Sequence, residues 1–274
     1  MSALIRIGAI DEDRFDRSRR IRWLDMERIE SARCFVAGAG ALGNEVIKNL
    51  VLSGVRSIVL VDMDYVVRSN LNRCVLFREE DALRKSMKAE IIAKRAKELN
   101  PEINITPINS RIEEIDLRCL KNYDVVFGCF DNIGARLHLN AHAYYYGVPY
   151  IDGGTDGTTG KIQVVLPPDT PCLQCATNKT HAKILEKRFS CTGADISIYE
   201  PKIPAEITTT SIIAAIQVRE GLKIISGKKE NCIRHVCYYN GLLNTFDSFE
   251  VSLDPMCPVH LSNLSNSIHP YSHS

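Results

Sequence analysis

Short apolar runs rich in β-branched residues alternate with longer amphipathic segments along the first half of the chain, and this alternation constrains the fold most. Strands separated by helices of this length form a parallel sheet with right-handed crossovers, covered on both faces. The sequence therefore predicts an α/β fold with a Rossmann-like, doubly wound, mostly parallel sheet. The expected strands are 33–38, 57–62, 103–109, 123–129 and 148–154, and the expected helices are 41–54, 85–100 and 135–147.

The second half of the chain is less regular. Residues 232–253 alternate like paired antiparallel strands around a turn at Asn240-Gly241, a dipeptide typical of hairpins. We therefore expect C-terminal antiparallel strands beside the parallel sheet. The other expected elements are a strand over 161–167, a long polar connection over 176–204 and a buried helix over 208–227 that ends at Gly227.

Neither an internal repeat nor a linker divides the chain into separate units. The expected organisation is an N-terminal helical arm over 1–32, with its helix at about 13–30, followed by one domain over 33–260. The polar tail over 261–274 is expected to be disordered.

Composition limits the partners and the location. The chain has 274 residues and a net charge of +1, which gives no reason to expect a nucleic-acid partner or a membrane surface. It has no apolar run of about 18 residues, and its N-terminus lacks the charged-then-apolar order of a signal peptide, so a cytoplasmic location is expected. The ten cysteines are then expected to be thiols or metal ligands rather than disulfides.

A glycine-rich turn joins the first expected strand to the first expected helix. The run VAGAGALG places Gly38, Gly40 and Gly43 in the pattern G-x-G-x-x-G, with Ala41 at the start of the helix. Such a turn lets a phosphate or ribose approach the backbone, and the helix N-terminus supplies unpaired N–H groups. Asp62 ends the next strand, where an acid would hold ribose hydroxyls. These features alone favour an adenosine-containing ligand, with NAD as the first candidate.

Polar side chains beyond Asp62 favour a triphosphate over NAD. Cationic side chains neutralise phosphate oxygens, while a carboxylate can hold magnesium. Asp131 and Asn132 follow the strand expected at 123–129, at the carboxyl edge where ligands of open α/β sheets bind. No Walker-type GxxxxGK[ST] is present, so any ATP chemistry is not that of a P-loop protein. The further candidate ligand-binding residues are Asp64, Ser69, Asn70, Asn72, Arg73 and Lys88.

Two ligand pairs have the spacing of a metal site. Cys172 and Cys175 form PCLQC, and Cys257 and His260 form CPVH. Pairs of this spacing are typical of a tetrahedral structural zinc site, which would clip the C-terminal strands to the main body. The alternative is that the four residues never meet.

Several motifs together resemble one known family, the ThiF/MoeB/HesA group of ubiquitin-activating-like enzymes. The family's order and spacing are shared by GAGALG, DMDYVVRSNLNR, the KAE of Lys88 to Glu90, Asn100-Pro101 and Asp131-Asn132. A helix of the eukaryotic members is similar to PAEITTTSIIAAIQVREGLKII. The resemblance covers about Arg14 to His260, so 33–260 would be a single ThiF-type adenylation domain.

The resemblance implies ATP-dependent adenylation of the C-terminal glycine of a ubiquitin-like or sulfur-carrier protein. The attacking carboxylate is ionised at neutral pH, so the chemistry requires charge neutralisation and positioning rather than a general base. On the family's pattern, Asp62 would hold the ribose, Asp131 a magnesium ion, and Asn70, Arg73 and Lys88 the phosphates.

Two further catalytic residues are implied. RFDRS is similar to the family's R-Y-x-R-Q segment, whose arginine reaches into the partner subunit's nucleotide site, so Arg17 is a candidate and a homodimer is expected. The alternative for Arg17 is a solvated helix charge. Cys191, in RFSCTGAD, lies where members that form a thioester or acyl-disulfide carry their reactive cysteine. Nearby Lys187 and Arg188 would favour a nucleophilic thiolate, although some relatives only adenylate.

Two residues depart from the family's pattern, because His260 and Cys74 stand where it has Cys and Gln. The expected partner is a small ubiquitin-fold carrier ending in Gly-Gly, received by the exposed sheet face and by residues 232–253, with a downstream conjugating or sulfur-transfer enzyme.

Three alternatives stay open. An NAD-dependent oxidoreductase would leave Arg73, Lys88 and the pair Asp131-Asn132 unused. A same-superfamily enzyme could adenylate a tRNA base modification or a peptide, although the CxxC and CxxH pairs with Cys191 favour a protein carrier. A catalytically silent half of a heterodimer would not need intact Arg73, Lys88 and Asp131.

Overall fold

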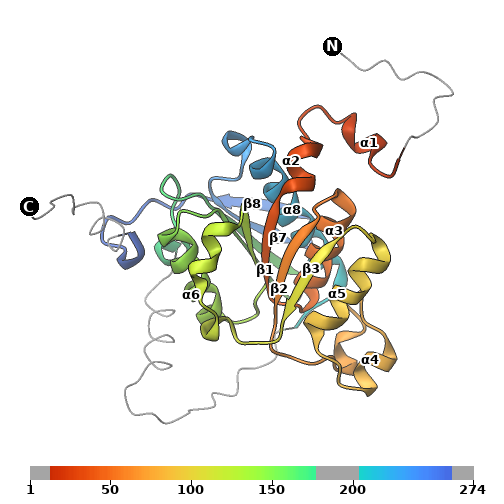
Figure 1. Cartoon of the computed structure of the whole chain (residues 1–274). Helices are drawn as coiled ribbons and strands as arrows, with labels where there is room; N and C mark the ends of the chain where they lie inside the picture. The colour runs from red at the N-terminus through yellow and green to blue at the C-terminus, as the bar shows by residue number, and fades with distance from the viewer. Residues whose placement is uncertain (1–12, 177–203, 261–274) are drawn as a thin grey trace, which may run out of the picture.

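The computed structural model describes residues 13–176 and 204–260, which form a domain around an eight-stranded sheet (Figure 1). Pairing is parallel in the first part of the sheet and antiparallel in the last part, so the predicted mixed sheet is confirmed. In spatial order the strands are β3 (Asn104–Ile108), β2 (Ser57–Val61), β1 (Arg33–Ala37), β4 (Val125–Gly128) and β5 (Tyr150–Asp156), all parallel, then β6 (Thr159–Val165), β7 (Val236–Asn240) and β8 (Thr245–Phe249).

Helices cover both faces of the sheet, and each face has its own apolar core. Successive strand residues point to opposite faces. On β1, for example, Val36 lies in one core and its neighbour Phe35 in the other. The first core packs under α3 (Ala41–Ser53), α5 (Lys88–Leu99) and α8 (Ile207–Ile225); the second packs under α6 (Ile133–Tyr145), η2 (Ile112–Glu114) and η3 (Leu117–Asn122). The remaining short helices are η1 (Arg68–Asn70), α4 (Glu79–Leu83), η4 (Leu173–Ala176) and η5 (Lys229–Asn231).

The N-terminal segment differs from the single helix expected over about 13–30. It forms two short helices, α1 (Asp16–Arg19) and α2 (Met26–Ser31). The Asp25 side chain accepts a hydrogen bond from the Arg28 backbone N–H at 3.2 Å, so Asp25 caps a new helix where a continuous one was expected.

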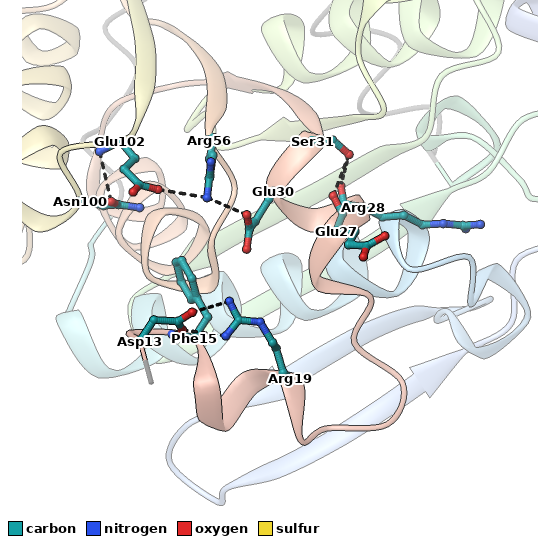
Figure 2. A network of polar contacts seen from close by, with 10 residues as sticks. All are labelled: Asp13, Phe15, Arg19, Glu27, Arg28, Glu30, Ser31, Arg56, Asn100 and Glu102. Carbon is teal, nitrogen blue, oxygen red and sulfur yellow. Dashed lines mark hydrogen bonds and ion pairs between the residues drawn. The ribbon is translucent and has the colours of Figure 1, made fainter. Parts of the chain in front are cut away.

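Polar contacts and one buried ring hold this segment against the main body (Figure 2). Arg56, just before β2, bridges Glu30 on α2 at 2.7 Å and Glu102 before β3 at 3.1 Å. The Phe15 ring is buried beside Gly54, at the end of α3. The N-terminal segment therefore lies at the amino ends of β2 and β3.

The C-terminal hairpin forms as expected but with a longer turn. The turn spans residues 241–244 rather than Asn240-Gly241 alone. The Asn240 Oδ1 atom accepts hydrogen bonds from the backbone N–H groups of Leu242 and Leu243, which stabilises the wider loop.

Some predictions fall outside the described residues: most of the polar connection, with Cys191, and the tail 261–274. Among the helices in the described ranges, none is long and apolar enough to cross a bilayer.

Candidate functional site

A cavity of about 280 Å³ opens where β2, β1, β4 and β5 end. This is the carboxyl edge of the parallel strands, where open α/β sheets bind their ligands. The structure brings most of the predicted nucleotide-binding residues together here. Of those predicted, the cavity is lined by Gly38, Gly40, Ala41, Asp62, Asp64, Ser69, Asn70, Arg73, Lys88 and Asp131, whereas Gly43, Asn72 and Asn132 lie outside its lining.

The three glycines of the turn are needed for different reasons. Gly38 has a φ of 101°, and a side-chain carbon there would lie 2.5 Å from the Cys129 carbonyl oxygen. A side-chain carbon at Gly43 would lie only 1.9 Å from the Gly38 carbonyl oxygen. Around Gly40, in contrast, the described chain places no heavy atom within 4 Å of such a carbon. Packing of helix on turn therefore requires Gly38 and Gly43, while Gly40 leaves an open backbone wall on the cavity.

Asp62, Asp64 and Lys88 form a charged group at the end of β2. Asp62 accepts hydrogen bonds from the backbone N–H groups of Ala39 at 2.6 Å and Asp64 at 2.8 Å. Burial raises the pKa of Asp62 above its ordinary value, against the opposing effects of Lys88 and these N–H groups.

Lys88 donates to the Asp64 carboxylate at 2.7 Å. Burial alone would lower the pKa of Lys88, but the attraction of Asp62 and the hydrogen bond to Asp64 outweigh it and raise the pKa. The lysine is therefore a fixed, fully protonated cation at neutral pH, and Asp64 keeps part of its carboxylate exposed beside it.

The turn after β2 holds the second cation. The buried Asn70 side chain accepts a hydrogen bond from the Val67 backbone N–H at 3.0 Å, which fixes this turn. Arg73 donates to the Ser69 carbonyl oxygen and, at 3.0 Å, to the Asn72 side chain. Asn72 thus holds the arginine rather than lining the cavity itself.

Cys74, the departure from the family's pattern, lies beneath this turn. It is buried in the apolar core, and burial raises the pKa of its thiol to about 11.

The loop after β4 brings Asp131 to the cavity, whereas Asn132 caps α6 by accepting a hydrogen bond from the Ala135 backbone N–H at 2.8 Å. Sequence reasoning missed Arg136, which also lines the cavity. Helical periodicity carries a signal for it, because Arg136 lies one turn after Asn132 on the helix that starts at the site. The other lining residues not predicted are Leu42, Val67, Cys129, Phe130, Thr155 and Ala205.

The four predicted zinc ligands meet, with their ligand atoms all within 4.8 Å of one another. The Cys172 sulfur lies 3.9 Å from that of Cys175 and 3.7 Å from that of Cys257, and the Cys175 sulfur lies 3.6 Å from His260 Nε2. Tetrahedral zinc bonds of about 2.3 Å to sulfur and 2.0–2.1 Å to nitrogen would separate such atoms by about 3.8 and 3.5 Å. The cluster therefore fits a Cys₃His zinc site, and the alternative that these residues never meet is wrong.

Arg17 lies on α1, at the amino edge of the sheet and away from the cavity (Figure 1). The neighbouring Phe15 packs on Gly54 and Arg14 donates to the Leu99 carbonyl oxygen, both at the opposite edge from the site. Arg17 is therefore not placed to act in the cavity of its own chain.

A family model described as the ThiF family matches residues 12–259. The chain belongs to the ThiF family. This confirms the resemblance found in the motifs. It is 35% identical over 151 residues to SUMO-activating enzyme subunit 2 of Dictyostelium discoideum (54% of this chain, 22% of that protein). Over 156 residues it is 38% identical to the NEDD8-activating enzyme E1 catalytic subunit of Arabidopsis thaliana (52% and 34%). The chain thus spans about a fifth to a third of the length of these relatives.

A third ThiF-family relative matches along most of both chains. The SAMP-activating enzyme E1 of Haloferax volcanii is 28% identical over 240 residues, which is 85% of this chain and 81% of that protein. Among solved structures, E. coli MccB with ATP superposes with a TM-score of 0.73 at 21% identity, covering 92% of this chain and 76% of MccB. At this identity the similarity to MccB shows the fold alone.

Proposed function

We propose that this ThiF-family chain uses ATP to adenylate the C-terminal carboxylate of a small ubiquitin-fold carrier protein ending in Gly-Gly. The observation that carries the proposal is the cavity itself, where Asp62, Lys88, Arg73 and Asp131 converge at the carboxyl edge of the sheet. The relatives named as SUMO-, NEDD8- and SAMP-activating enzymes support a protein carrier as the substrate.

In this proposal, Asp62 accepts hydrogen bonds from the ribose, and Asn70, Arg73 and Lys88 bind the phosphates. An attack of one anion on another is slow until fixed cations offset the repulsion. The fixed cation Lys88 and the guanidinium of Arg73 suit that task, and they need no reorganisation during the reaction. Magnesium, when bound, would offset further phosphate charge, and the donor that fits it is the Asp131 carboxylate. The carrier's carboxylate is already ionised, so the chain positions it and supplies no base.

The Cys₃His cluster is proposed to hold structural zinc. Cys172 and Cys175 lie beside α6, and Cys257 and His260 lie at the end of the described chain, so one ion would join the two segments. The stack of the Tyr144 ring on His260, with centroids 4.4 Å apart, would orient the imidazole.

The C-terminal hairpin offers a surface for the carrier. A groove of about 470 Å³ follows β7 and β8. Around the hairpin, several large apolar side chains are exposed: Tyr238, Leu242, Leu243, Phe246 and Phe249. Exposed apolar patches of this kind are typical of protein interaction sites. We propose this hairpin surface as part of the carrier's docking site.

Arg17 and Cys191 complete the proposal. Because Arg17 lies at the opposite edge from its own cavity, it would act in a partner subunit of a homodimer. Mixing Arg17→Ala and Lys88→Met chains would then restore part of the activity that each lacks alone, since one site of the mixed dimer is complete. The Cys191 thiolate would displace AMP from the adenylated carrier and form a thioester for a downstream conjugating enzyme. If a sulfur-transfer enzyme first converted Cys191 to a persulfide, the same displacement of AMP would give an acyl-disulfide. A Cys191→Ala chain that still forms a thiol-sensitive carrier adduct would refute that role.

Pyrophosphate exchange into ATP tests the function. The expected result is exchange that requires a Gly-Gly-ending carrier, together with a rise of the melting temperature with ATP but not with NAD. Stabilisation by NAD alone would favour the oxidoreductase. Exchange that requires a peptide or a modified tRNA, and that no carrier supports, would indicate that the chain adenylates one of the superfamily's other substrates.

A further inference from the structure

Asn140 is a buried amide in the second half of α6, on the side of the helix that meets the Cys₃His cluster. Its side chain is fully buried, and its Oδ1 atom accepts a hydrogen bond from the Leu173 backbone N–H at 3.0 Å. Leu173 directly follows the ligand Cys172, so this bond holds the loop between the first two ligands. Asn140 does not line the nucleotide cavity, so the proposed adenylation leaves it without a role.

The bond to Leu173 also fixes which way the amide faces. Only the oxygen of an asparagine side chain can accept a hydrogen bond, so Oδ1 faces the Leu173 N–H and the two N–H donors of Nδ2 face the other way. Nδ2 is buried, and within residues 13–176 and 204–260 no acceptor stands in hydrogen-bonding geometry to it. Because a buried donor without an acceptor costs free energy, a partner for this atom is expected.

The Cys172 sulfur is the acceptor within reach of Nδ2. Burial raises the pKa of the Cys172 thiol to about 12, whereas hydrogen bonds from the Cys175 backbone N–H and the Asn140 side chain act to lower this pKa. A neutral thiol is a weak acceptor, but a thiolate, the form that binds zinc, accepts a strong charge-assisted hydrogen bond. Asn140 therefore suits the metal-binding form of Cys172 better than the neutral thiol.

Comparison of the two ligand pairs shows what Asn140 adds. In each pair the backbone N–H of the fourth residue donates to the carbonyl oxygen of the first, Cys175 to Cys172 at 3.1 Å and His260 to Cys257 at 3.0 Å. Burial raises the pKa of Cys257 too, and the backbone N–H groups of Val259 and His260 act to lower it. Cys257 thus draws its N–H donors from its own turn, whereas Cys172 draws one from its own turn and one from α6.

The same helix also contacts the second pair. Tyr144 lies one helical turn after Asn140, and its ring stacks on His260 with centroids 4.4 Å apart. One face of α6 therefore meets a ligand of each pair, although the pairs come from segments 85 residues apart.

We propose that Asn140 positions the Cys172 thiolate, with Oδ1 holding the Leu173 N–H and Nδ2 donating to the sulfur. This role rests on the structural zinc site proposed above, not on the adenylation. The added donor offsets part of the negative charge on the sulfur and fixes its direction, so the cluster binds its metal more tightly. Asn140 is thus a positioning residue that makes no contact with the metal itself.

NMR of the wild-type chain loaded with a spin-active isotope of cadmium tests this hydrogen bond. Cadmium binds the same thiolate ligands, and its nuclear spin couples to protons that are hydrogen-bonded to a ligand sulfur. Coupling is expected from the backbone N–H groups of Cys175, Val259 and His260, and also from the Asn140 side-chain amide. The backbone signals are the internal control, and their presence without an Asn140 signal would overturn the proposal.

Substitutions measure what the bond contributes to metal binding. Asn140→Asp keeps an acceptor for the Leu173 N–H but removes the donor, and Asn140→Leu removes both at a similar size. Each should weaken zinc binding by about tenfold to a hundredfold, measured on the full chain by competition with a chromogenic chelator.

Asn100→Asp is the matched control, and it should keep the wild-type zinc affinity. Asn100 is also buried, accepts the Glu102 backbone N–H at 3.3 Å, and has an Nδ2 atom without a partner in the described part of the chain. It differs in lying directly after α5, outside the cluster.

Wild-type zinc affinity in both Asn140 variants would overturn the proposal. The cadmium measurement needs no substitution, so it decides the hydrogen bond even where a variant does not fold. A wild-type chain that binds neither metal would overturn this role together with the zinc site, whereas carrier-dependent pyrophosphate exchange tests the adenylation separately.

Discussion

Lys88 Nζ lies 2.7 Å from the Asp64 carboxylate. Lys88 is the first residue of α5, the helix that packs against β2 and β3. Asp64 also accepts the backbone N–H of Lys88 at its own carbonyl oxygen, at 2.9 Å. Two contacts thus fix one cation at the cavity, and its position does not depend on a bound nucleotide.

Lys88→Met should lower carrier-dependent pyrophosphate exchange by about a hundredfold or more, because a preorganised cation is lost where phosphate charge must be stabilised. Initial exchange rates measure this. Lys94→Ala is the control, since Lys94 is exposed on the same helix. Near-wild-type exchange in Lys88→Met would contradict the role.

Gly43→Ala and Gly40→Ala should differ in stability. The new methyl group at residue 43 would lie 1.9 Å from the Gly38 carbonyl oxygen, so the free energy of unfolding should fall by about 1–3 kcal/mol or more. Gly40→Ala meets open space and should change it by about 0.5 kcal/mol or less, while weakening ATP binding. Urea unfolding curves check the pair, and equal losses would contradict this account of the turn.

The glycine turn is an example of a feature that could be predicted from the sequence alone. The turn, the strands and the helices are local patterns. The motif order predicted that the candidate ligand-binding residues lie at the carboxyl edge of the sheet, and most of them line the cavity there. Arg136 was not predicted because its place at the cavity depends on Asp152 and Gly154, which come together with it only when α6 packs beside β5. Asn132 follows a strand, where a ligand-binding residue is expected, yet its side chain caps α6. A ligand-binding residue and a helix cap have the same position in a sequence, so the sequence alone does not distinguish them.

The prediction of a single N-terminal helix was wrong because it overlooked a helix cap within the segment. Its charge pattern favours a helix throughout, but α1 ends at Arg19 and the Asp25 side chain caps a second helix that begins at Met26. The zinc ligands were predictable because spacing within each pair is local, although the pairs are 85 residues apart.

Purified chain should contain about one zinc ion per molecule. His260→Ala or Cys257→Ser should lower the zinc content and the melting temperature, because metal binding contributes to folding. Cys119→Ser, outside the cluster, is the control. Metal analysis by mass spectrometry that finds well under one zinc, in protein purified without chelator, would refute the site.

Glu206 should stabilise α8 in a pH-dependent way. Its carboxylate accepts hydrogen bonds from the backbone N–H groups of Thr208 and Thr209, at 2.7 and 2.6 Å. Burial acts to raise the pKa of Glu206, but these contacts outweigh it and lower the pKa to about 2. The stabilisation is therefore complete above the ordinary pKa of 4.5 and is lost as the pH falls toward about 2.

Glu206→Ala should accordingly reduce the free energy of unfolding by about 1 kcal/mol at pH 7, as for loss of a helix cap. The difference from wild type should shrink in acid, measured by urea unfolding at pH 7 and below pH 4.5. Glu230→Ala, at an exposed position, serves as the control. A difference that stays constant across this range would rule out the carboxylate as its source.

Phe249→Ser should weaken carrier binding by about tenfold or more, because it removes a large apolar side chain from the proposed docking surface. ATP affinity should stay unchanged, since β8 does not line the cavity. Leu52→Ser is a matched control: Leu52 is 54% exposed on α3, against 55% for Phe249. Calorimetric titration of carrier into each variant measures the effect, and equal affinities would place the carrier elsewhere.

The proposed adenylation breaks the bond between the α- and β-phosphates of ATP and transfers AMP to the carrier. The most direct measurement follows ATP labelled separately at the α- and γ-phosphates during incubation with carrier. Adenylation predicts that the α-label becomes bound to the carrier's C-terminus, or appears in AMP once Cys191 has captured the carrier, while the γ-label leaves in pyrophosphate. Transfer of the γ-label to the carrier, or its release as inorganic phosphate with ADP as the other product, would contradict the account.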